Sequence, residues 1–166
     1  LRNACIIARM VNESQKAIKA YWFFTPYTVP DKRLLQLLKP EKHEVALHVV
    51  NKPEEEWKEL EQKTGRTIKY YSIHGTENRV AQLIWGRHGK SQVVPKSDFP
   101  LRSFHDFTTM SLDRERYLHG YEKTLKSIHA WAEQDVVLSI HPDWLFKINN
   151  KTNRGPYYDV LKSALE

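Results

Sequence analysis

The stretch "EVALHVV" at residues 44–50 is an almost continuous apolar run, and "NKPEEEWKELEQKTG" at 51–65 follows it directly. A short run rich in valine is typical of a buried strand. The second stretch begins with a proline and three glutamates, which favour the first turn of a helix, and it ends at Gly65, which favours a helix end. A buried strand that leads straight into a helix predicts a parallel α/β fold, because parallel strands need a long crossover between them.

The same alternation continues on both sides of this stretch, and the chain is short enough to form one domain over residues 1–166. We expect strands at 21–25, 44–50, 67–73, 101–107 and 136–140, with a short strand at 91–94 as a sixth. We expect helices at 4–19, 30–40, 51–65, 76–87, 113–133 and 156–166. This number of strands is too small for a complete eight-stranded barrel, so the pattern predicts mostly parallel strands in an open sheet or an incomplete β/α barrel.

Composition excludes several classes of protein. The formal charge is +6, but the sequence contains no run of Lys and Arg and no zinc-finger spacing, so we do not expect nucleic acid as a partner. No apolar run approaches the roughly 18 residues of a membrane span, so we expect no membrane partner. Cys5 is the only cysteine and cannot form an intrachain disulfide. Nothing therefore requires an oxidising compartment, and we expect a cytoplasmic protein.

Histidines recur where the expected strands end. His48, His74 and His141 close three of these strands, and His105 with Asp106 stands in a fourth. Because the loops that follow parallel strands lie at one edge of the sheet, these side chains are expected to share a site. A single histidine at a strand end is more often structural, but four at equivalent ends favour a common site. Imidazole binds divalent metals and exchanges protons near neutral pH, and a carboxylate can orient it.

Three segments resemble the polysaccharide deacetylase family: "YWFFTPY" at 21–27, "KHEVALHVVN" at 42–51 and "VVLSIHP" at 136–142. The resemblance implies a distorted, incomplete β/α barrel. It also implies a divalent metal, often zinc, held by an aspartate and two histidines, and removal of an acetyl group from a sugar. By position, His48 looks like the first metal histidine and His141 looks like the general acid.

The sequence departs from the family pattern at the remaining ligands. The family places its second metal histidine four residues after the first, where this chain has Lys52. The chain contains no Asp-Asp pair, and "SIHGT" at 72–76 stands where the family has an arginine-containing motif. Three alternatives follow: His74 with Asp106 or His105 replaces the missing ligands, the site is altered or lost, or an amino-terminal part that precedes this chain supplies it. In the last case the chain lacks the family's first strand. A second copy could cover the unpaired sheet edge, which would make the protein a homo-oligomer.

Two functions remain for this pattern. The first is a metal-dependent hydrolase acting on a sugar amide or ester, with metal ligands at His48, His74 and His105, a ligand or base at Asp106 and an acid at His141. The second is a non-catalytic deacetylase-like domain that binds a glycan or a protein partner. A nucleotide-binding or phosphate-binding domain is a weaker third alternative, because the glycine-rich phosphate motifs are absent.

Overall fold

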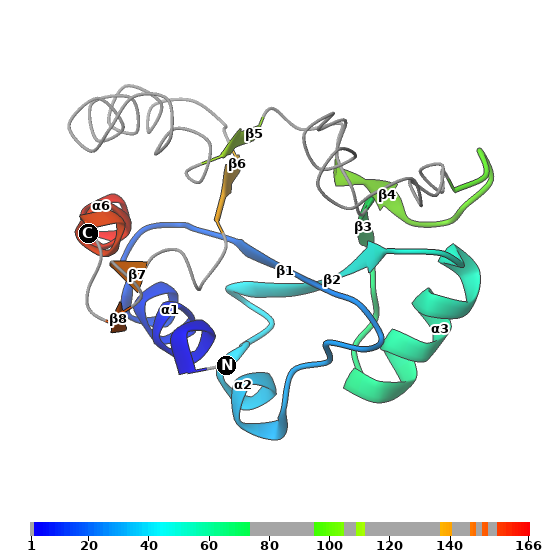
Figure 1. Ribbon diagram of the computed structural model, residues 1–166, viewed down its shortest axis with the longest axis horizontal. Coiled ribbons are helices and arrows are strands. Elements are labelled where there is room, and N and C mark those ends of the chain that lie inside the picture. Colours follow the sequence, from blue (N-terminus) through cyan, green and yellow to red (C-terminus); the bar gives the residue numbers. More distant parts are fainter. Residues whose placement is uncertain are drawn as a thin grey trace. The chain divides into compact units, whose positions relative to one another are not determined.

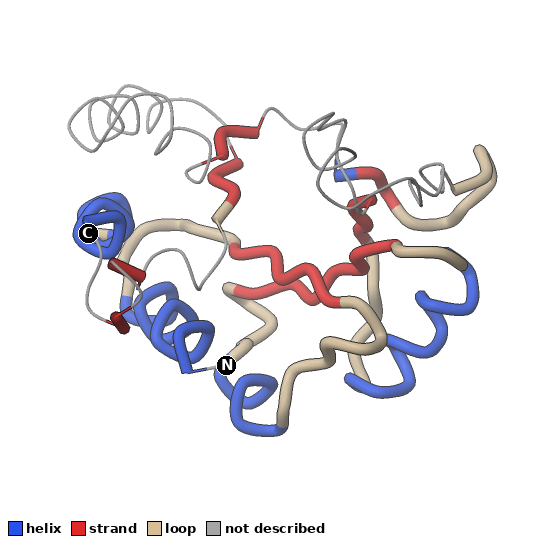
Figure 2. Tube along the Cα trace, in the orientation of Figure 1, coloured by secondary structure: helices blue, strands red, loops and turns tan. Residues whose placement is uncertain are grey.

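The protein divides into two compact units in the computed structural model. The sheet unit comprises residues 20–31 and 43–104, and the terminal unit comprises residues 1–19, 32–42 and 105–166. Figure 2 shows how helices and strands follow one another along the chain. The structure describes residues 2–73, 95–104, 109–111, 137–140, 147–148, 151–152 and 156–166.

The sheet unit is built on four parallel strands, β1 (Ala20–Phe24), β2 (His43–Val49), β3 (Tyr70–Ile73) and β4 (Arg102–Ser103). Their order in the sheet is β1-β2-β3-β4, the same as in the sequence (Figure 1). The prediction of a parallel α/β fold is therefore confirmed. The incomplete barrel stays a prediction, because this order occurs both in open sheets and in barrels.

Helix α3 (Pro53–Thr64) follows β2 and packs against it. Its first turn holds Pro53 and three glutamates, which suit the positive end of the helix dipole. Its other end is closed by Gly65 at a φ of 63°, where the backbone N–H donates to the carbonyl oxygen of Glu61 at 2.8 Å. Leu60 is fully buried. The helix expected at 51–65 is thus confirmed.

The two faces of the sheet differ, because successive side chains of a strand point to opposite sides. We call one of them the His43 face; on β2 it carries His43 and the buried Val45, Leu47 and Val49. We call the other the His48 face; on β2 it carries Glu44, Ala46 and His48.

Ring contacts show which face α3 covers. Phe99, in the segment before β4, packs edge-on against Trp57 of α3, with ring centroids 6.0 Å apart. Phe99 also packs against Tyr71 of β3 at 5.3 Å. Since Tyr71 pairs with Leu47, these rings and α3 lie on the His43 face.

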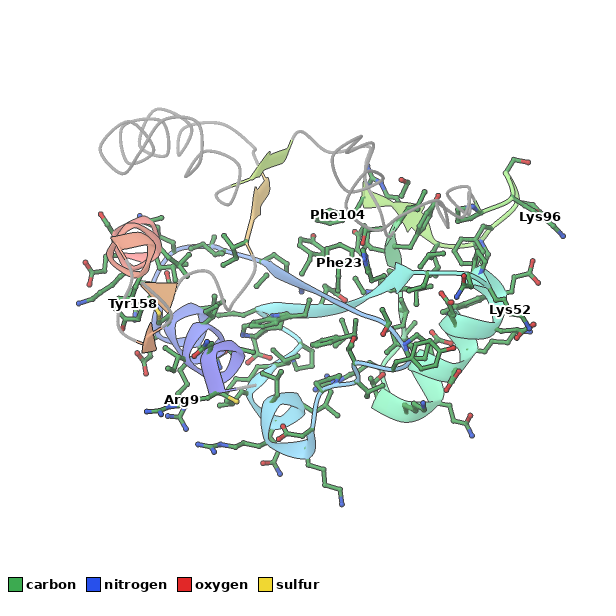
Figure 3. The ribbon with its side chains drawn as sticks, in the orientation of Figure 1. Arg9, Phe23, Lys52, Lys96, Phe104 and Tyr158 are labelled. Carbon is green, nitrogen blue, oxygen red and sulfur yellow. The ribbon has the colours of Figure 1, made fainter. Side chains whose placement is uncertain are left out.

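The His48 face carries an aromatic cluster of its own. Phe104, which follows β4, lies 4.9 Å from Tyr21 and 4.8 Å from Phe23 between ring centroids. Figure 3 shows Phe23 and Phe104 close to one another beside the sheet. Tyr21 and Tyr70 meet edge-on at 5.2 Å. This cluster links the outer strands of the sheet across β2 and β3.

A tight turn follows β1. The hydroxyl of Thr25 accepts the backbone N–H of Tyr27 at 3.2 Å and that of Thr28 at 3.1 Å, while the Thr28 hydroxyl accepts the N–H of Thr25 at 3.0 Å. Pro26 is buried, and its carbonyl oxygen accepts Lys63 Nζ at 3.0 Å. Tyr27 points outward and is 77% exposed.

The terminal unit contains helices α1 (Arg2–Glu13), α2 (Lys32–Leu37) and α6 (Pro156–Leu165). Helix α1 packs against the other two, with Cys5, Ile7, Ala8, Val11, Leu34, Leu38, Leu161 and Leu165 among the buried side chains. Asn12 Nδ2 donates to the Leu37 carbonyl at 2.9 Å. The buried hydroxyl of Ser14 donates to the Leu165 carbonyl, which ties the end of α1 to the end of α6.

Helix α1 ends at Glu13, earlier than the expected 4–19. Lys42 Nζ approaches the carbonyl oxygens of Val11 at 3.2 Å and Asn12 at 3.3 Å, and it also donates to the carbonyl of Ser14. A cation at the negative end of the helix satisfies carbonyl groups that have no partner within it. This contact comes from a distant part of the chain, so the local pattern could not indicate it.

Two further strand pairs lie in the terminal unit. β5 (Thr109–Ser111) and β6 (Val137–Ser139) are parallel, and β7 (Lys147–Ile148) and β8 (Lys151–Thr152) are antiparallel. Of these four strands, β6 falls in a strand expected from the sequence, at 136–140, and β5, β7 and β8 were not expected. The expected elements at 76–87, 91–94 and 113–133 lie outside the described residues. Within the part of the chain that the structure describes, no helix is long and apolar enough to cross a membrane.

Candidate functional site

His48 lies next to the last residue of β2, at the carboxyl edge of the sheet. The register pairs it directly with Ser72 of β3. Both side chains are half-buried, and His48 Nδ1 lies 2.8 Å from Ser72 Oγ. This is the edge at which parallel α/β folds place their sites, so the structure puts His48 where the sequence predicted it.

The loop after His48 is held by a buried carboxylate. Glu56 of α3 is only 4% exposed, and its Oε2 accepts the backbone N–H of Val50 at 2.8 Å. Its Oε1 accepts the N–H groups of Asn51 at 2.8 Å and Lys52 at 3.1 Å. One side chain thus satisfies three backbone donors and fixes the path of the chain from β2 into α3. Sequence reasoning missed this role, because Glu54, Glu55 and Glu56 look alike in the sequence.

Lys52 occupies the position at which the deacetylase family has its second metal histidine. Its Nζ lies 2.8 Å from Glu55 Oε2, and both side chains are well exposed. The hydrogen bond to Glu55 and the charge of that carboxylate raise the pKa of Lys52 above its ordinary value. Figure 3 shows Lys52 at the start of α3. A protonated amine cannot ligate a metal, so this position does not supply the missing ligand.

A hollow of about 300 Å³ lies beside the same end of α3. Its walls come from the first turn of α3 and from the segment that includes Pro95, Lys96 and Phe99. Phe99 belongs to the His43 face, and His48 does not line this hollow. The hollow and the His48–Ser72 pair are therefore separate features.

The remaining predicted site residues, His74, His105, Asp106 and His141, lie outside the described residues. Their convergence with His48 stays a prediction. Among the residues that the structure describes, no group of three or more His, Cys, Asp and Glu side chains could hold a metal ion. His48 fits as one metal ligand, and the described residues do not complete a set around it.

Sequence reasoning missed the role of His43, which lies one residue before the strand expected at 44–50. The structure makes His43 the first residue of β2, only 4% exposed. Its Nδ1 accepts the indole N–H of Trp22 at 2.9 Å, and Trp22 stands on the neighbouring strand β1. The alternation of His43 with Val45 and Leu47 is the signal that could have indicated its burial.

Comparison with known proteins adds no functional assignment. No protein-family model matches the chain, and no match was found among curated proteins or among solved structures. The resemblance to polysaccharide deacetylases therefore stays a prediction from short motifs. The functional interpretation depends on the positions of the chain's own residues.

Proposed function

We propose that the protein is a divergent deacetylase-like hydrolase that removes an acyl group from a sugar amide or ester with the help of a divalent metal, zinc being the first candidate. The observation that supports this most directly is the position of His48. It lies at the carboxyl end of an inner strand in a parallel sheet, with its ring held by Ser72 at 2.8 Å. Histidine ligands of metals typically make such a hydrogen bond through their other ring nitrogen.

The residues proposed to hold the metal are His48, His74 and His105, with Asp106 as a further ligand or as the base and His141 as the acid. Of these, His48 alone has a described environment. A bound metal would polarise the acyl carbonyl and lower the pKa of a bound water to about 7. The proposal requires the chain to bring these five side chains together, and the described part of it that supports this is His48 at the carboxyl edge of the sheet.

The test uses the purified full chain with zinc added and the excess removed. We expect bound zinc and release of acetate from an N-acetylated hexosamine oligomer. His48→Ala removes a proposed metal ligand and should lower the rate at least about 100-fold, the upper range for losing an outer-shell partner of such a ligand. Gln36→Ala, at an exposed position of α2, is the matched control and should keep the rate of the parent protein. Acetate release that persists in His48→Ala would refute the assignment.

A second candidate function is a non-catalytic domain that binds a glycan. The specific observation in its favour is Lys52, which is engaged with Glu55 where the family has a metal histidine. This alternative predicts no bound zinc and no acetate release, but measurable binding of the same oligomer by calorimetry. Zinc bound in equal amounts by the parent protein and by Gln36→Ala, and lost in His48→Ala, would count against it.

A further inference from the structure

We propose that Ser72 is a positioning residue for His48. Its Oγ accepts the Nδ1–H of the imidazole and so holds the ring in the tautomer whose Nε2 carries no proton. The inference rests on the proposed function in one respect, since a neutral imidazole ligates zinc only through a nitrogen without a proton. It names the residue that prepares His48 for that role.

The geometry of the pair depends on the sheet and not on a loop. His48 and Ser72 face each other in the register of β2 and β3, and β2 also pairs with β1 on its other side. The distance of 2.8 Å between His48 Nδ1 and Ser72 Oγ lies at the short end of the range for N–H···O hydrogen bonds. Both side chains are half-buried, so water competes less for this contact than at an exposed site.

A second imidazole on the same strand shows why the partner decides the tautomer. An indole N–H can only donate, so His43 Nδ1 must accept from Trp22 and cannot carry a proton there. A serine hydroxyl can donate or accept, and it therefore permits the opposite arrangement at His48. β2 would then carry two imidazoles in opposite tautomers, one suited to packing and one suited to binding.

A competing role for the pair is a nucleophilic serine with His48 as its base. Such a serine needs backbone N–H donors for the oxyanion that forms on the acyl group. The N–H groups that follow His48 in the chain, those of Val50, Asn51 and Lys52, all donate to Glu56. The described donors in the loop after β2 are thus already engaged with Glu56, which favours the positioning role.

The tautomer is measured directly by the ¹⁵N shifts of the ring nitrogens in the labelled full chain at mildly alkaline pH. We expect His48 Nδ1 to be pyrrole-like and Nε2 to be pyridine-like. In Ser72→Ala both shifts should move toward the average of the two tautomers, and Ser72→Thr should restore them because it keeps the hydroxyl. His43 is the internal control, and its shifts should not change in either variant.

Three results would overturn the proposal: a protonated Nε2 in the parent protein, His48 shifts that are unchanged in Ser72→Ala, and covalent labelling of Ser72 by a fluorophosphonate, which reports a nucleophile. If the protein binds no zinc and releases no acetate, the proposed function fails while the ring shifts still decide the role of Ser72. If zinc binds, Ser72→Ala should weaken its affinity by about 10–100-fold. Unchanged zinc affinity would then also count against the positioning role.

Discussion

The two ends of β2 carry the same side chain in opposite settings. His43, at the start of the strand, is 4% exposed and accepts the N–H of Trp22 at 2.9 Å. His48, near the end, is half-buried and meets the hydroxyl of Ser72 at 2.8 Å. The alternation of the strand places them on opposite faces of the sheet, so residue type alone does not tell which histidine is structural.

The two histidines also differ in the parts of the protein that surround them. The His43 face is packed by α3 and by the rings of Trp57, Phe99 and Tyr71. The His48 end of the strand leads into a loop whose conformation depends on Glu56. Packing therefore covers the His43 face of the sheet, and a single carboxylate organises the loop that follows His48. The difference between the two histidine environments can be tested by substituting, one at a time, the side chains that contact each of them or lie beside them.

The largest effect is expected from Glu56→Ala. The substitution leaves the N–H groups of Val50, Asn51 and Lys52 without their shared acceptor, and it should lower the free energy of unfolding by about 3 kcal/mol. Urea denaturation of the full chain measures the change. Glu54→Ala, an exposed glutamate of the same helical turn, is the control and should change stability by less than about 0.5 kcal/mol. Equal effects of the two variants would contradict the special role of Glu56.

An intermediate effect is expected for the pair of Trp22 and His43. A double-mutant cycle with Trp22→Phe and His43→Phe should give a coupling energy of about 1 kcal/mol, the net contribution of one hydrogen bond. The same cycle with His48→Phe in place of His43→Phe should be additive within about 0.5 kcal/mol, because His48 lies on the other face. Coupling of Trp22 to His48 would show that the assignment of faces is wrong.

The smallest effect concerns Tyr21, which neighbours Trp22 but points to the His48 face. Burial, then the charge and hydrogen bond of Tyr70, raise the pKa of Tyr21 above its ordinary value of 10.0. As the pH rises through 10, the unfolded chain loses this proton first, so the contribution to stability is present below about pH 10 and declines above it. Tyr21→Phe should therefore make the urea midpoint fall less steeply between about pH 9 and pH 11. An unchanged slope would contradict the raised pKa.

The sequence was sufficient to predict the elements around "EVALHVV". β2, α3 and β1 lie within two residues of their expected bounds, because apolar runs, Pro53 and Gly65 are strong local signals. The position of His48 at a strand end followed from the same signals. These features depend on residues close together in the chain, which is why a pattern could indicate them.

Features that depend on distant partners could not be predicted in this way. Of the three consecutive glutamates, Glu56 is the buried one because α3 is rotated about its axis so that this side chain faces the sheet and the loop after β2. At the early end of α1, the carbonyl groups are contacted by Lys42, which approaches from a different segment. Ser72 gave no signal in the sequence, because its relevance comes entirely from the register of β3 against β2.

The turn after β1 has a consequence for how the chain meets proteases. Tyr27, with 77% of its surface exposed, offers chymotrypsin the side chain that it prefers. Yet a protease binds its substrate as an extended strand, and the two threonine hydroxyls with the buried Pro26 hold this segment in a closed turn. Cleavage after Tyr27 therefore requires the turn to open first. The rate of cleavage at this bond would therefore measure how often the turn at the end of β1 opens locally.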